Sequence, residues 1–323
     1  MNRPKFRWIN LRNRLPESWK QNRVPGIPEL NWQSLFSFYL RKADTEDVRM
    51  RAAYMSFNIM LAFFPAIIFF FTLVAYLPFE DAHKDVLLLL KNLMPDTAFK
   101  SISETLEDIV GKQRGGLLSF GFILAIYFST SAIDSMIRSF HRSLKIRDKR
   151  SIVKKRLYSF LMNFLISLLL VLALGLITLG QGALSWLSDT GAVSKGIVLF
   201  LLNSFNWVLV IGLILVSVSL MYTYGPMNRR SWPFFSKGSI MATISILIMS
   251  VVLSLYVNNF NAYNKIYGSI GTLVVIMLWI YWNSLMILAS FDLNILLDDL
   301  KQRGLRREEL ERKQRGNVKL DEA

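Results

Sequence analysis

Long apolar blocks, each nearly free of charge and separated by polar segments, dominate the pattern along this chain. A run of roughly 20 such residues is long enough to cross the ~30 Å hydrocarbon core of a bilayer as a helix. The runs lie at 53–76, 116–137, 157–180, 197–225, 239–258 and 269–296. The pattern therefore predicts an all-α polytopic membrane protein with six transmembrane helices.

The segment before the first run, residues 1–52, is polar and basic but contains one amphipathic stretch. Its apolar residues recur at helical spacing and share one face: Trp32, Leu35, Phe36, Tyr39 and Leu40. Arg41 and Lys42 follow directly in the sequence. The spacing predicts an interfacial helix that lies in the inner headgroup layer of the membrane.

The segment 77–115, between the first two runs, carries two further helical patterns. Residues 86–94 are apolar and end before Pro95, and a second apolar stripe begins at Ile102. We expect an extracytoplasmic helical hairpin here. Two interpretations stay open, a cap packed over the bundle or a surface that docks an envelope partner.

The distribution of positive charge sets the predicted orientation. Most of the 38 Lys and Arg residues fall in four segments: 1–52, 137–156, 226–238 and 298–323. Basic residues that flank membrane spans stay in the cytoplasm. Both termini are therefore expected in the cytoplasm, with a six-helix transmembrane domain at 53–297 and a charged tail at 298–323.

The same basic clusters bear on the partners of the protein, whose net charge is +15. Each cluster adjoins the end of an apolar run, where it meets anionic headgroups at about 1 kcal/mol per charge. A nucleic-acid-binding domain instead gathers its basic residues on one face or helix. We expect membrane lipids as partners and no nucleic acid, and the sequence does not indicate an oligomeric state.

The composition excludes several kinds of functional site. The chain has no cysteine, which excludes disulfides, thiolate catalysis and cysteine metal ligands. His83 and His141 lie far apart and flank different apolar runs, whereas a metal site needs three or four convergent ligands. No catalytic residue, metal site or cofactor is predicted, and the chain is not expected to be an enzyme.

Polar residues within the apolar runs are functional candidates because charge at membrane depth is costly. Asp134 precedes Arg138 by one helical turn, so a local ion pair explains it as well as a place on a transport pathway. Asp292, near the inner end of the sixth run, either lines a pathway, snorkels or caps. Asn58, two turns before Pro65, is either a pathway residue or an interhelical hydrogen-bonding group.

Proline and glycine mark the expected bends and turns. Pro65 interrupts the first run and removes one backbone donor, and Pro226 closes the fourth run. The densest motif is the Tyr- and Asn-rich segment 256–271, which joins the last two runs through a short outer turn. Its glycines allow tight re-entry and close helix contact. The residues singled out in this turn are Tyr267, Gly268 and Gly271.

At these residues the chain resembles the YihY/BrkB family of bacterial inner-membrane proteins, over roughly residues 45–297. The matching positions are Ala62 and Pro65, Gly116-Leu117-Leu118, Ser131-Ala132, Tyr222 and Pro226, Trp232 and Gly238, Tyr267-Gly268, and Trp279-Ile280-Tyr281. The chain departs from the family pattern at Phe57-Asn58 and Phe140-His141. The family's Gly-Ala-Glu-Leu-Asn is similar to residues 290–294, which keep the acid and the Asn but not the glycine.

The resemblance implies an integral inner-membrane protein of the cell envelope, with suggested roles in moving lipids or envelope precursors. The leading hypothesis is a transporter or flippase-like protein for an amphiphilic envelope component, with a pathway lined by Asn58, Asp134, Tyr222, Tyr267 and Asp292. The alternative is a non-transporting scaffold that recruits envelope partners. A membrane-bound hydrolase is more distant, although some family members carry a ribonuclease-type name, because metal-dependent hydrolysis needs clustered ligands.

Overall fold

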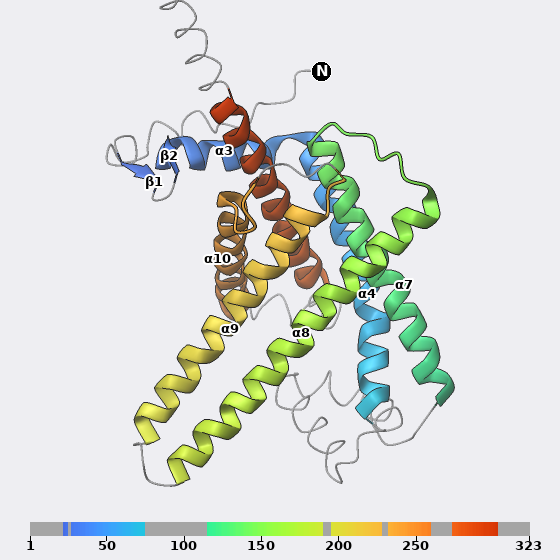
Figure 1. Ribbon diagram of the computed structural model, residues 1–323, viewed down its shortest axis with the longest axis vertical. Helices are drawn as coiled ribbons and strands as arrows, with labels where there is room; N and C mark the ends of the chain where they lie inside the picture. The colour runs from blue at the N-terminus through green and yellow to red at the C-terminus, as the bar shows by residue number, and fades with distance from the viewer. Residues whose placement is uncertain are drawn as a thin grey trace, which may run out of the picture.

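The computed structural model describes residues 22–24, 27–74, 115–189, 195–227, 232–259 and 273–302, and this part of the chain is mainly helical. Its helices are α3 (Trp32–Asp44), α4 (Glu46–Val74), α7 (Gly115–Ser143), α8 (Ile152–Asp189), α9 (Lys195–Tyr224), α10 (Lys237–Asn259) and a last helix, Leu273–Gln302. Figure 1 shows the last helix in red. The predicted all-α architecture is confirmed.

Five of these helices contain stretches long and apolar enough to cross a bilayer: Glu46–Phe69, Gly115–Ser143, Ile152–Ile177, Ser204–Tyr224 and Leu273–Gln302. α10 adds a shorter apolar stretch, Lys237–Leu253. Each predicted run coincides with one helix, so the protein is a polytopic membrane protein. The first spanning helix, α4, begins at Glu46, whereas the apolar run begins at 53. The acidic side chains of Glu46 and Asp47 in its first turn suit the positive end of the helix dipole.

The amphipathic stretch forms α3, as predicted. The Asn31 side chain caps its start by accepting a 2.8 Å hydrogen bond from the Ser34 amide. Figure 1 shows α3 lying across one end of the bundle, above α10. We call this end of the bundle the α3 end. Placement of α3 in the headgroup layer stays a prediction.

A two-stranded antiparallel sheet precedes α3 and was not predicted. It pairs β1 (Arg23–Val24) with β2 (Ile27–Asn31). β1 has only two residues, and the five residues of β2, Ile-Pro-Glu-Leu-Asn, lack the apolar–polar alternation by which a strand is recognised. The sheet packs onto the bundle through a small apolar cluster that includes Val24, Ile27, Leu35 and Leu293.

The main hydrophobic core lies at the α3 end of the bundle. It draws buried side chains from six helices: Met55 of α4, Phe140 of α7, Met162 of α8, Met221 of α9, Ala242 of α10 and Leu288 of the last helix are among them. Farther from α3, α8 and α9 pack on each other and extend away from the α4–α7 pair (Figure 1). Many of their apolar side chains are exposed there, as expected for helices that face lipid.

Several predictions concern residues outside the described part of the chain. They are the hairpin at 77–115, the turn residues Tyr267, Gly268 and Gly271, and the charged tail beyond residue 302.

Candidate functional site

Asp292 connects the last helix to α3. Its carboxylate is buried, with 6% of the side chain exposed, and Oδ2 lies 2.7 Å from the Lys42 ammonium nitrogen. Two residues earlier in that helix, the Ser290 hydroxyl shares a 2.7 Å hydrogen bond with the Tyr39 hydroxyl. Burial raises the pKa of Tyr39 to about 12, so this hydroxyl stays protonated. Asp292 thus forms an ion pair that joins the last helix to α3.

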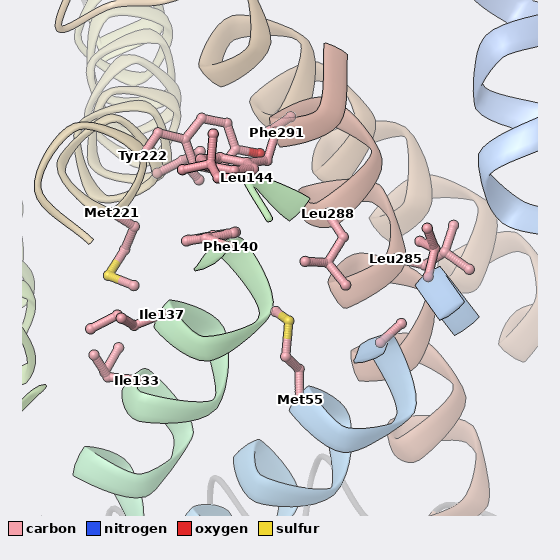
Figure 2. Close-up of a cluster of buried hydrophobic side chains, with 14 of the residues drawn as sticks. Met55, Ile133, Ile137, Phe140, Leu144, Met221, Tyr222, Leu285, Leu288 and Phe291 are labelled. Atoms are coloured by element: carbon pink, nitrogen blue, oxygen red, sulfur yellow. The ribbon is translucent and has the colours of Figure 1, made fainter. Parts of the chain in front are cut away.

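Tyr222 lies in the core rather than on a polar surface. Its hydroxyl donates to the carbonyl oxygen of Ile287, and its ring meets Phe291 edge-on at 5.2 Å between centroids. Phe140 stacks on Phe291 at 4.4 Å and contacts Tyr222 edge-on at 5.5 Å. Figure 2 shows these three rings gathered between α7, α9 and the last helix. The structure therefore brings Tyr222 and Asp292 to the same stretch of the last helix.

Asp134 forms the local ion pair that its spacing predicts. Its Oδ2 accepts a 2.8 Å hydrogen bond from Arg138 Nε and lies 2.8 Å from Arg138 Nη2. Its other oxygen accepts a longer bond, 3.4 Å, from the Ser159 hydroxyl of α8. The pair with Arg138 lets a carboxylate lie on a membrane helix without remaining uncompensated.

Asn58 also bonds within its own helix, where its side-chain amide donates to the Tyr54 carbonyl oxygen at 2.8 Å. Pro65 is buried inside α4, which continues through it to Val74. Pro226 is buried directly after the end of α9. Asn58 and Asp134 thus bond mainly within their own helices, whereas Tyr222 and Asp292 bond to residues of other helices.

A mainly apolar groove of about 740 Å³ opens beneath α3. We call it the α3 groove, and its walls come from α3, the start of α4, α10 and the last helix. The lining residues are Trp32, Leu35, Phe36, Tyr39, Leu40, Ala43, Asp44, Arg49, Met241, Ile244, Ser245, Ile248, Met249, Tyr281, Trp282, Leu285 and Met286. Its volume lies in the roughly 300–1,000 Å³ range of small-molecule sites. The charged side chains in its wall are Asp44 and Arg49, both exposed.

Sequence reasoning noted part of this groove and missed the rest. Tyr281 was noted among the positions that match the family pattern. The stripe of α3 that includes Tyr39 was also predicted. The α10 wall and Arg49 were missed, because nothing in the sequence pairs the faces of separate helices.

The connection between α7 and α8 is held by a compact charged cluster. The Asp148 carboxylate accepts hydrogen bonds from the Arg150 side chain at 2.9 to 3.3 Å and from the Arg150 amide at 2.9 Å. His141 Nε2 accepts a 2.9 Å bond from the Met227 amide, and its Nδ1 lies 3.8 Å from Asp148. This cluster links the end of α7 to the segment that follows α9.

The Asp148 carboxylate is expected to stabilise this connection at neutral pH. Burial raises its pKa, but the hydrogen bonds and charge of Arg150 outweigh burial and lower the pKa from 3.8 to about 2. Such a shift contributes about 2 kcal/mol. Since the folded pKa is the lower one, the contribution is complete above about pH 4 and disappears as the pH falls through 2.

Asp148→Asn should therefore lower the midpoint of thermal unfolding at pH 7 and speed hydrogen exchange of the 145–151 amides. Lys149→Gln, an exposed neighbour in the same loop, serves as the control and should change neither. Equal exchange in the Asp148→Asn variant and the parent protein would show that the cluster contributes no stability.

A metal site would need several side chains that can bind the ion together. Within them, no group of three or more His, Cys, Asp or Glu side chains lies close enough to hold a metal ion. His141 instead uses its ring nitrogens to join separate segments of the chain.

Comparison with known proteins identifies the family of this chain. The model of the virulence factor BrkB family matches residues 39–316. A ribonuclease-like protein of Bacillus subtilis, YfkH, is 28% identical over 84% of this chain and 96% of its own length. UPF0761 membrane proteins of Alteromonas mediterranea and Psychromonas ingrahamii are 23% and 24% identical, over 79% and 82% of this chain and 85% and 88% of theirs. No solved structure matches.

Proposed function

This chain belongs to the virulence factor BrkB family, and we propose that it is an inner-membrane transporter or flippase-like protein for a lipid or other amphiphilic envelope component. The amphiphile enters through the α3 groove. Both termini, and with them the α3 end of the bundle, face the cytoplasm in this proposal.

The α3 groove is the observation that supports this proposal. Its wall is mostly apolar, while Asp44, Arg49 and the hydroxyls of Tyr39 and Ser245 add polar groups. Ligand sites combine an apolar lining with a few polar groups that fix orientation. A groove built in this way beneath an amphipathic helix suits a molecule with an apolar tail and a polar head.

The candidate acid lies beside this groove. Tyr39 lines it and bonds Ser290, which lies two residues before Asp292. The ion pair between Asp292 and Lys42 fastens α3 to the last helix. In the proposal, movement of α3 opens the groove, and Asn58, Asp134, Tyr222 and Tyr267 belong to the pathway that follows.

Lipid movement can be measured with the full chain reconstituted into vesicles that contain a fluorescent phosphatidylglycerol. The quenching of label in the outer leaflet then reports exchange between leaflets. We expect faster exchange than in protein-free vesicles. Ile244→Trp, which fills the groove, should slow it about tenfold, equivalent to about 1.4 kcal/mol.

Ile240→Trp is a matched control for that substitution. Ile240 and Ile244 both lie on α10 and are both 43% exposed, but only Ile244 lines the groove. Exchange by Ile240→Trp should stay close to that of the parent. Exchange no faster than in protein-free vesicles, or equal loss in the two variants, contradicts transport through the groove.

A scaffold without transport is favoured by a different observation, the hydrogen bonds that three of the candidate residues make within the bundle. Asp134 bonds Arg138, Tyr222 bonds Ile287, and Asn58 bonds Tyr54, as expected for groups that hold a bundle together. Full function of Asp292→Ala and Asn58→Ala at normal membrane abundance would favour this alternative. Loss of function at normal abundance would favour transport.

A further inference from the structure

A second groove, away from α3, lies between α7 and α8. It has a volume of about 430 Å³ and opens broadly at the surface of the bundle. Six of its lining residues matter here: Ile123, Ile126, Tyr127, Thr130, Arg156 and Phe160. Its wall is mostly apolar, but it holds one cation and one buried hydroxyl. We call it the α7–α8 groove.

Arg156 is held in a fixed position at this groove. Its guanidinium carbon lies 4.5 Å from the centre of the Tyr127 ring, and Nη2 donates to the Tyr127 carbonyl oxygen at 3.0 Å. Arginine carries five N–H donors in a planar fork, so this one contact leaves others for a ligand. The side chain is half-buried near the start of α8, directly after Lys154 and Lys155 of the first turn.

Thr130 contributes a hydroxyl that the described part of the chain leaves unsatisfied. The residue is 2% exposed and lines the groove, yet its Oγ1 has no hydrogen-bond partner there. Many hydroxyls in these helices bond back to a carbonyl one turn earlier, as Thr72 does to Ile68, whereas those of Ser219 and Ser284 lack a partner as Thr130 does. Buried polar groups normally have a partner, and of these three hydroxyl residues only Thr130 lines the α7–α8 groove, where a bound ligand would supply that partner.

We propose that the α7–α8 groove binds one anionic phospholipid of the surrounding bilayer. Arg156 holds its phosphate, the Thr130 hydroxyl donates to an ester carbonyl, and the apolar wall contacts an acyl chain. Guanidinium–phosphate hydrogen bonds are charge-assisted and fix orientation as well as charge. The basic first turn of α8 favours an anionic headgroup over a zwitterionic one. A lipid held here fills the space between α7 and α8 whether or not the protein transports.

The test uses the purified full chain in a neutral detergent, with phosphatidylglycerol or phosphatidylcholine added and bound lipid counted by native mass spectrometry. We expect phosphatidylglycerol to bind about tenfold more tightly than phosphatidylcholine. Arg156→Gln should remove that preference. Arg147→Gln, which removes one exposed charge from the preceding loop, should retain it.

Thr130→Val keeps the test decisive even if Arg156→Gln folds poorly. Valine has the shape of threonine without the hydroxyl, so this variant should unfold no earlier than the parent without lipid. It should nevertheless bind phosphatidylglycerol about fivefold more weakly, because one hydrogen bond to the ester is lost. Equal binding of the two lipids by the parent, or unchanged phosphatidylglycerol affinity in Thr130→Val, overturns the proposal. The Ile244→Trp variant should bind this lipid normally, which separates this site from the α3 groove.

Discussion

Gly238→Ala should lower the thermal stability of the detergent-purified protein sharply. A Cβ atom at this position would overlap the Ser290 carbonyl oxygen and lie 2.6 Å from the Asn294 side chain. The Gly238 amide also donates to Asn294 Oδ1 at 2.7 Å, and Asn294 in turn donates to Ser236. Since backbone must move to admit the methyl group, we expect a loss of about 3 kcal/mol.

Gly175→Ala is the matched control, because Gly175 also lies within a helix, α8, but a Cβ atom added there would meet no other atom within 4 Å. Alanine favours helix over glycine by about 1 kcal/mol, so this variant should be as stable as the parent or more so. Tryptophan fluorescence during heating measures both variants. Equal unfolding midpoints for the two alanine variants would mean that α10 and the last helix do not approach this closely.

The second large effect is expected from Phe291→Ala. Phe291 is fully buried, stacks on Phe140 and meets Tyr222 and Trp232 edge-on. Removal of its ring leaves a cavity where three helices meet, at a cost of about 3–5 kcal/mol. We expect low accumulation in the membrane and an unfolding midpoint well below that of the parent.

Phe164→Ala provides the comparison, because Phe164 of α8 is 55% exposed and lies on the apolar surface of the bundle. Its removal should cost little, since lipid or detergent replaces the ring. A similar loss of stability in both variants would place the core elsewhere than at the α3 end.

Local features of this protein were predictable from its sequence. The apolar runs gave the positions of the spans, because a helix that crosses lipid satisfies its backbone internally and needs only length and apolarity. The spacing of Trp32, Leu35 and Tyr39 gave α3. One helical turn between Asp134 and Arg138 was enough to predict their ion pair, since both lie on one helix.

Contacts between distant segments were not predictable. Lys42 and Asp292 lie 250 positions apart, and no local rule pairs α3 with the last helix. Arg51 illustrates the same limit, because it was counted among the cytoplasmic cations. It is instead buried between α4 and α7, where it donates to the Ser139 carbonyl and the Ser143 hydroxyl. Both grooves arise in this way, from faces of separate helices that meet only in the folded chain.

Membrane orientation is the claim on which the proposed function rests, and cysteine labelling measures it directly. The chain has no cysteine, so a single cysteine introduced at Lys149 or Asp189 is the only thiol that the reagent can label. We expect an impermeant maleimide to label Asp189→Cys in intact spheroplasts and Lys149→Cys only after the membrane is opened. Labelling of Lys149→Cys in intact spheroplasts would place the α3 end outside the cell and contradict entry of an amphiphile from the cytoplasmic side.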